Sequence, residues 1–97
     1  MFYYKIHQTE FSQVVAICDE DLLGRIFEEE LFILDVKQSF YGGKKIGEEF
    51  CRQLLQDAGN LNIAGEKAVQ LCLDLGLIEK EELKRIHNIP FIFLSVA

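Results

Sequence analysis

The chain has 97 residues, of which 49% are hydrophobic and 27% charged, and its formal net charge at pH 7 is −6. This length predicts a single domain covering residues 1–97, and the composition is that of a globular protein and not a disordered one. The acidic balance disfavours broad electrostatic binding to a nucleic-acid backbone, which needs a basic face.

Three cysteines are present, Cys18, Cys51 and Cys72, and no two of them form a CxxC pair. The first residues lack the basic region and long apolar run of a signal peptide. No apolar stretch reaches the eighteen or so residues of a membrane span. These features predict a soluble, reduced protein of the cytoplasm.

The first half of the chain has the pattern of strands. Apolar residues alternate with polar ones over residues 2–7, and residues 14–18 are apolar and β-branched throughout, so the two segments are expected to form an antiparallel hairpin. A short strand over residues 25–28 and a stronger one over residues 31–37 are expected to follow.

The second half changes to helical spacing. Ile46, Phe50, Leu54 and Ala58 recur every four residues and predict a helix that stops at Gly59. After a short link at residues 60–64, a second helix is expected over residues 65–75, and a short third one over residues 79–83. The apolar run at residues 91–96 predicts a final strand.

Strands and helices that are largely segregated along the chain indicate an α+β fold. We expect a two-layer sandwich, in which a mainly antiparallel sheet carries two main helices on one face.

Several segments, taken together and in order, resemble one family. They are residues 16–24, the Phe-Tyr-Gly-Gly turn at residues 40–43, the Asn-Ile-Ala-Gly-Glu segment at residues 62–66, and residues 76–78. The sequence is similar to the small archaeal family known as domain of unknown function 424. The resemblance implies a compact α/β two-layer domain of the archaeal cytoplasm, and it implies no activity, because none is assigned to the family.

The final strand departs from the pattern of this family, which opens it with Gly-Val-Pro-His-Ala-Gln. The glycine, histidine and glutamine positions are Asn88, Phe91 and Phe93 here. A functional site built on those polar groups in relatives would be lost or replaced in this chain.

The most informative short segment is Tyr41-Gly42-Gly43-Lys44-Lys45. Two glycines before a helix could bring backbone N–H groups to an anion, with the lysines supplying charge and Tyr41 a hydroxyl or a stacking surface. Alternatively, the glycines serve a tight corner between a strand and a helix, and this reading is favoured because glycine is common at turns.

A second candidate anion site is the start of the second helix, where Asn62, Gly65 and Glu66 come together. Glu66 could act as a general base if it were partly buried. The alternative, again favoured, is that Asn62 holds the link through backbone hydrogen bonds and Glu66 complements the helix dipole.

Metal and nucleophile chemistry have little support in the sequence. His7 and His87 lack ligand-like spacing to each other or to acids, so we expect no metal site and no cofactor. Each cysteine falls in an apolar register, which predicts buried and unreactive thiols.

The final strand is apolar on both faces, because Phe91 and Phe93 alternate with Ile92 and Leu94. Helices cover only one face of a two-layer sheet, so the other face of this strand, together with Ile33, is expected to meet a partner protein or a second copy. The sequence thus favours a non-enzymatic binding or adaptor module of the archaeal cytoplasm, associated with RNA only within a larger assembly. The alternative is a small ligand-binding domain or enzyme with an anion site at a helix N-terminus.

Overall fold

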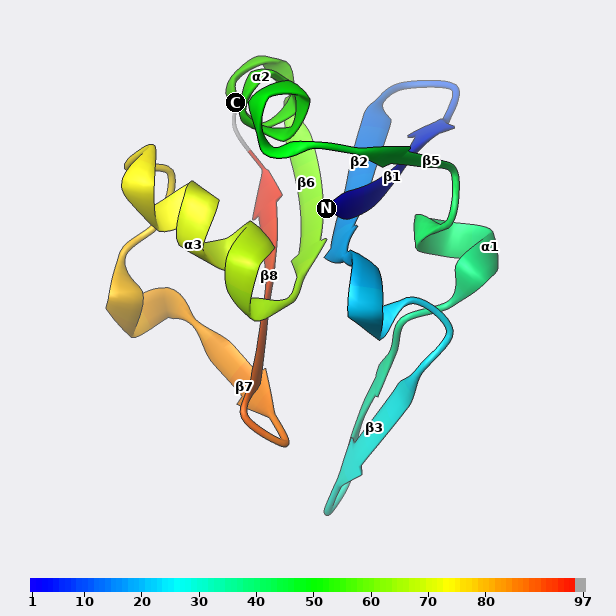
Figure 1. Cartoon of the computed structure of the whole chain (residues 1–97), viewed down its shortest axis with the longest axis vertical. Coiled ribbons are helices and arrows are strands. Elements are labelled where there is room, and N and C mark those ends of the chain that lie inside the picture. Colours follow the sequence, from blue (N-terminus) through cyan, green and yellow to red (C-terminus); the bar gives the residue numbers. More distant parts are fainter. Residues whose placement is uncertain (96–97) are drawn as a thin grey trace.

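The computed structural model of the protein describes residues 1–95 (Figure 1). Eight strands and three α-helices follow one another in these residues. They are β1 (Phe2–Gln8), β2 (Gln13–Asp19), β3 (Ile26–Glu29), β4 (Phe32–Asp35), α1 (Gln38–Tyr41), β5 (Lys44–Ile46), α2 (Glu48–Asp57), β6 (Asn60–Ala64), α3 (Glu66–Asp74), β7 (Lys84–Ile86) and β8 (Ile89–Ser95). Single 3₁₀ turns lie at Glu20–Leu22 and Lys80–Glu82.

Six of the strands form one sheet in the order β5-β1-β2-β6-β8-β7, and β3 and β4 form a separate hairpin. Every neighbouring pair in the large sheet is antiparallel except β2 and β6, which run parallel. The predicted α+β class and mainly antiparallel sheet are confirmed, as is the hairpin of β1 and β2.

The helices α2 and α3 cover one face of this sheet, as predicted (Figure 1). Their apolar stripes include Cys51 and Leu55 on α2 and Val69 on α3, and these side chains pack with Ile17 and Ile63 of the sheet. The four-residue spacing seen in the sequence therefore gives the main core of the protein.

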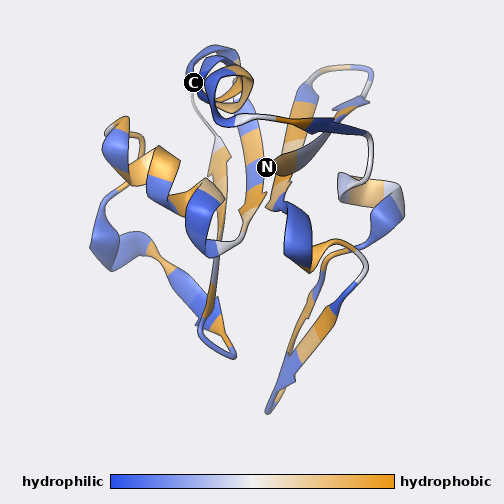
Figure 2. Cartoon of the chain, in the orientation of Figure 1, coloured by the Kyte–Doolittle hydropathy of each residue, from blue (hydrophilic) through white to orange (hydrophobic). Residues whose placement is uncertain are grey.

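A second, smaller core lies on the opposite face of the sheet. Leu34, Val36 and Tyr41 pack there against Ala16 and Cys18 of β2. Because β2 is covered on both faces, its side chains from Val15 to Cys18 are all buried. The strands in the middle of the sheet are accordingly mostly hydrophobic, whereas the tip of the β3–β4 hairpin is hydrophilic (Figure 2).

Two expectations about the middle of the chain are wrong. Residues 60–64 are not a link but the strand β6, which lies between β2 and β8 in the sheet. Lys44 and Lys45 do not open a helix either, because they lie on β5, and α2 begins only at Glu48 after Gly47.

The C-terminal region is a hairpin. A two-residue turn, His87-Asn88, joins β7 to β8, and both turn residues have positive φ, 50° and 66°. The expected third helix is a single 3₁₀ turn, and the expected final strand begins earlier, at Ile89. Its expected last residue, Val96, lies outside the described residues. None of the helices within residues 1–95 has the length and apolarity needed to cross a membrane.

Candidate functional site

An open groove of about 340 Å³ lies on the sheet face opposite α2 and α3. It runs between the β3–β4 hairpin, α1 and β8, and we call it the aromatic groove. Its lining residues are Ile33, Leu34, Asp35, Lys37, Phe40, Tyr41, Asn62, Phe91 and Phe93.

A hydrogen bond joins two of the side chains that line this groove. The hydroxyl of Tyr41, a buried residue of α1, donates to Oδ1 of Asn62 on β6 over 2.6 Å. Burial raises the pKa of Tyr41, so the hydroxyl stays protonated and remains a donor. Because Oδ1 accepts from Tyr41, the amide has one fixed orientation, and its Nδ2 group is left to donate to a ligand.

The walls of the groove are apolar and largely open to solvent. Phe93 of β8 is 72% exposed and Ile33 of β4 is 65% exposed, while Phe91 is half-buried between them and the core. Lys37 and Asp35 lie at the rim with their charged groups 3.9 Å apart. The rim therefore offers one charge of each sign.

Exposed apolar side chains are frequent on the elements that border this groove. Of the nine large hydrophobic residues that are exposed within the described chain, five lie on the β3–β4 hairpin or on β8. These five are Ile26, Leu31, Phe32, Ile33 and Phe93. Two of them, Ile33 and Phe93, line the groove, whereas Phe32 lines a separate hollow with Arg85 and Ile86.

The double-glycine corner lies apart from the groove amide. A Cβ on Gly43 would overlap the carbonyl oxygen of Tyr4, so the glycine allows the chain to pass close to β1. The ammonium of Lys45 lies 2.8 Å from the carboxylate of Glu20, and both side chains are exposed. Lys44 pairs with Tyr4 across the two strands.

Gly42 follows α1 directly, and its N–H donates to the carbonyl of Gln38 over 2.8 Å. A Cβ there would lie 2.6 Å from that same oxygen. The structure therefore brings Tyr41 to Asn62 and does not bring either of the two lysines to that pair.

The first N–H groups of α3 bind a carboxylate of the protein itself. Asp19 accepts hydrogen bonds from the N–H of Lys67 over 2.9 Å and of Ala68 over 2.8 Å. Gly65 precedes this helix with φ +118°, and Glu66 reaches Arg85 of β7 in an ion pair of 3.3 Å. The predicted anion position at this helix N-terminus is therefore occupied by the protein itself, through the carboxylate of Asp19 on β2.

Sequence reasoning missed the role of Asp19, which stands among three consecutive acids. The sequence does show that Asp19 directly follows a fully apolar strand. That it accepts from the N–H groups of α3 could be found only by knowing that β6, which precedes α3, lies parallel to β2. Burial raises the pKa of Asp19 despite the two N–H donors, which act in the opposite direction.

The cysteines are buried and free, as predicted. Burial raises the pKa of each thiol, of Cys18, Cys51 and Cys72, to about 12. All three thiols are therefore protonated at neutral pH, and the thiolate that nucleophilic chemistry needs is absent.

Both histidines contact backbone carbonyl groups. Nε2 of His7 lies 2.7 Å from the carbonyl oxygen of Phe40, on whose ring the imidazole stacks at a centroid distance of 4.4 Å. His87 makes the equivalent contact with the carbonyl of Glu28 at the tip of the β3–β4 hairpin. Within residues 1–95, no three side chains of the metal-binding types gather into one group.

Two of the groove residues stand at the positions where the sequence departs from the resembled family pattern. Phe91 and Phe93 replace histidine and glutamine there, and both line the aromatic groove. Asn88, in place of glycine, has φ 66°, a conformation that asparagine adopts more readily than most residues. Phe91 and Phe93 therefore make the groove of this chain apolar at two positions where the pattern is polar.

Comparisons with known proteins agree with this description. The family model described as "Protein of unknown function (DUF424)" matches residues 7–96. A crystal structure of an uncharacterized conserved protein from Methanopyrus kandleri is similar, with a TM-score of 0.79 and 27% sequence identity. The similarity covers 98% of this chain and 90% of that one. No curated protein matches the sequence. The model spans almost the whole chain, which therefore belongs to the DUF424 family of proteins of unknown function.

Proposed function

We propose that the chain is a non-enzymatic binding module of the archaeal cytoplasm whose aromatic groove takes an extended segment of a partner protein. The observation that carries the proposal is the Tyr41–Asn62 hydrogen bond, which lies between exposed apolar walls. A groove with apolar walls and a few oriented polar groups is the usual form of a binding site.

The amide of Asn62 suits a peptide group. Its Nδ2 can donate to a peptide carbonyl, and Oδ1 keeps a second lone pair for a peptide N–H. Since Tyr41 holds Oδ1, little rotational freedom is lost when a peptide binds, which favours affinity. The hydrogen bonds of Asn62 would be made to the backbone of the partner and would not depend on the partner's side chains.

The walls supply apolar contacts to the side chains of such a segment. Ile33 and Phe93 face the groove from two different elements, β4 and β8. Fully covering one such side chain contributes about 2 kcal/mol. Two or three apolar residues of a partner, flanking one peptide group on Asn62, account for specific binding.

The groups that could perform catalysis have structural roles, and this supports binding without reaction. Tyr41 is a neutral donor, the thiols are protonated, and each histidine ring contacts a backbone carbonyl. Glu66, the candidate general base, is exposed and ion-paired with Arg85.

A protein segment fits the groove better than RNA does. Its rim has one acid and one base, and the chain as a whole carries a charge of −6. A nucleic-acid site needs a positive groove beside its aromatic residues. Association with an RNA assembly would on this proposal pass through the bound protein.

The test is affinity capture with three forms of the chain, from a lysate of the archaeon that encodes it. Ile33→Asp places a charge in the groove wall. Phe11→Asp is the matched control, because Phe11 is 92% exposed in the turn between β1 and β2, away from the groove. The captured proteins are quantified by mass spectrometry, with and without ribonuclease.

We expect a defined protein on the wild-type chain and on Phe11→Asp, at least tenfold less of it on Ile33→Asp, and no effect of ribonuclease. Capture that is equal on all three forms would contradict a role for the groove. Capture that ribonuclease abolishes would assign the surface to RNA instead.

A further inference from the structure

The outer edge of β8 is only partly covered. β7 pairs with β8 at three positions, Ile89, Pro90 and Phe91. From Ile92 to Ser95 the strand has β6 on one side and no neighbouring strand on the other, within the part of the chain that the structure describes. Such an edge offers unpaired N–H and C=O groups to another strand.

The register shows which backbone groups face this open edge. The N–H of Gly65, at the end of β6, donates to the carbonyl of Pro90 over 2.9 Å, so Pro90 directs its backbone toward β6. Direction alternates along a strand. Phe91, Phe93 and Ser95 therefore direct their N–H and C=O groups away from β6, and β7 reaches only Phe91 of the three.

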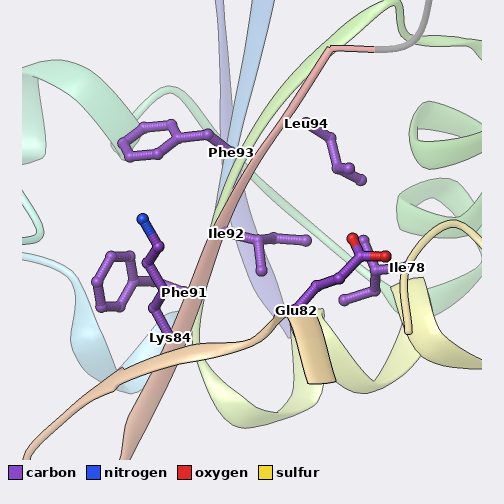
Figure 3. A pocket seen from close by; sticks show the side chains of 7 residues that line it. All are labelled: Ile78, Glu82, Lys84, Phe91, Ile92, Phe93 and Leu94. Atoms are coloured by element: carbon purple, nitrogen blue, oxygen red, sulfur yellow. The ribbon is translucent and has the colours of Figure 1, made fainter. Parts of the chain in front are cut away.

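A hollow of about 100 Å³ lies beside this edge (Figure 3). Phe91, Phe93 and the side chain of Lys84 lie on one side of the β8 ribbon, and Ile92, Leu94, Ile78 and Glu82 lie on the other. An added strand would thus find apolar contacts on both of its faces as well as backbone partners, which is the pattern of recognition by strand addition.

We propose that this edge pairs antiparallel with the same edge of a second copy of the chain, so that two sheets join across a two-fold axis. An antiparallel edge is self-complementary, because the donors and acceptors of Phe93 and Ser95 meet the same groups of the partner. In the joined sheet the added strand lies beside Phe93, which is 72% exposed. On the helix side, the side chains of the added strand enter the hollow beside Ile78.

The charge at this edge is compatible with a second copy as the occupant. The whole chain carries −6, so two copies repel one another in general. The charged residues that line this hollow are Glu82 and Lys84, one of each sign, so the edge itself is locally neutral. The edge therefore adds no net charge to a contact between two copies.

The two-fold arrangement puts both aromatic grooves on the same face of the joined sheet. The proposed dimer does not depend on what the groove binds. The two proposals are tested at different residues, the groove at Ile33 and the edge at Ser95.

The test compares Ser95→Pro with Ser95→Ala by sedimentation equilibrium over a wide range of protein concentration. Proline removes the N–H of residue 95, which has no strand partner in one copy but pairs in the dimer. Both variants lose the 2.9 Å hydrogen bond between the Ser95 hydroxyl and Asn60, so alanine controls for that contact. Circular dichroism checks that both variants fold.

We expect the wild-type chain and Ser95→Ala to reach twice the mass of one chain. For Ser95→Pro we expect the dissociation constant of the dimer to rise at least about tenfold. In the wild type, hydrogen exchange at the amides of Phe93 and Ser95 should also slow as the concentration rises. A wild-type chain that stays monomeric, or a dimer that Ser95→Pro leaves unchanged, would overturn the proposal. The proposal would also be overturned if the chain stayed monomeric and hydrogen exchange at Phe93 and Ser95 slowed only when a peptide of another protein was added.

Discussion

The carboxylate of Asp19 packs directly against Gly65, in the place that a Cβ on Gly65 would have to occupy. The carboxylate reaches this place from the end of β2 and accepts the first free N–H groups of α3. Gly65 follows β6 directly and has φ +118°, a conformation in which L side chains are strained. One glycine therefore allows both the sharp entry into the helix and the cap that comes from a neighbouring strand.

Gly65→Ala should destabilise the protein by about 3 kcal/mol, the sum of backbone strain and a displaced helix cap. Gly24→Ala is the matched control, because Gly24 also has positive φ, +84°, but has no atom within 4 Å of the added Cβ. The control should lose only about 1 kcal/mol of strain. Urea unfolding of the three proteins measures both losses, and equal losses would show that the contact with Asp19 costs nothing.

The Asp19 carboxyl should make stability depend on pH in an unusual direction. Its pKa is raised in the folded protein because burial disfavours the charged form more than the two N–H donors favour it. The folded state then binds the proton more tightly than the unfolded state. The stability that this group contributes is present below its unfolded pKa and is lost as the pH rises through the folded one.

Asp19→Asn removes this titration and keeps an oxygen acceptor for the helix. The unfolding free energy of the wild type minus that of the Asp19→Asn variant should therefore fall as the pH rises through the acid range. Urea unfolding at a series of pH values measures this difference, with NMR titration of the Asp19 carboxyl as a direct check. A difference that rises with pH would mean that the N–H groups dominate and the pKa is lowered.

The sequence was sufficient for elements whose periodicity is decided locally. The apolar spacing of α2 and the alternation in β1 reflect one buried face each, and both were predicted. The strand β6 was not, because Asn60 and Asn62 are poor strand formers and Gly59 and Gly65 flank it like a loop. Only its position between β2 and β8, where Leu61 and Ile63 are buried, makes it a strand.

The residues of the candidate site were also predicted only in part, because their proximity depends on the order of the strands. The sequence identifies three separate candidates: Tyr41 in the aromatic turn, Asn62 at the helix start, and the two phenylalanines of the final strand. The structure places them in one groove, since α1 packs on the sheet face that β6 and β8 share. Distances of this kind depend on strand order, which local patterns do not encode.

Tyr41→Phe should leave the fold intact, reduce stability by about 1 kcal/mol and weaken binding in the groove several-fold. The hydroxyl makes one hydrogen bond, to Asn62, and its loss leaves an acceptor that water can reach because Asn62 is only half-buried. The amide is then free to rotate, which adds an ordering cost to binding. Urea unfolding and the capture experiment measure the two effects separately.

Tyr3→Phe is the control for this change. Tyr3 packs on the same side of the sheet, and its hydroxyl makes no side-chain hydrogen bond within the described residues. It should alter neither quantity measurably. If Tyr41→Phe bound its partner as well as this control does, the oriented amide would have no part in recognition.

The thiols should be almost inert toward alkylation in the folded protein. Burial raises the pKa of all three to about 12, whereas an unperturbed thiol titrates near pH 8.5. At pH 8 the thiolate fraction is then smaller by roughly a thousandfold, apart from any steric protection. Iodoacetamide labelling followed by mass spectrometry should show no modified cysteine in the native protein and three in urea. Rapid labelling of one cysteine under native conditions would reveal local opening there, and with Cys18 it would mean that the smaller core, against which Tyr41 packs, is not closed.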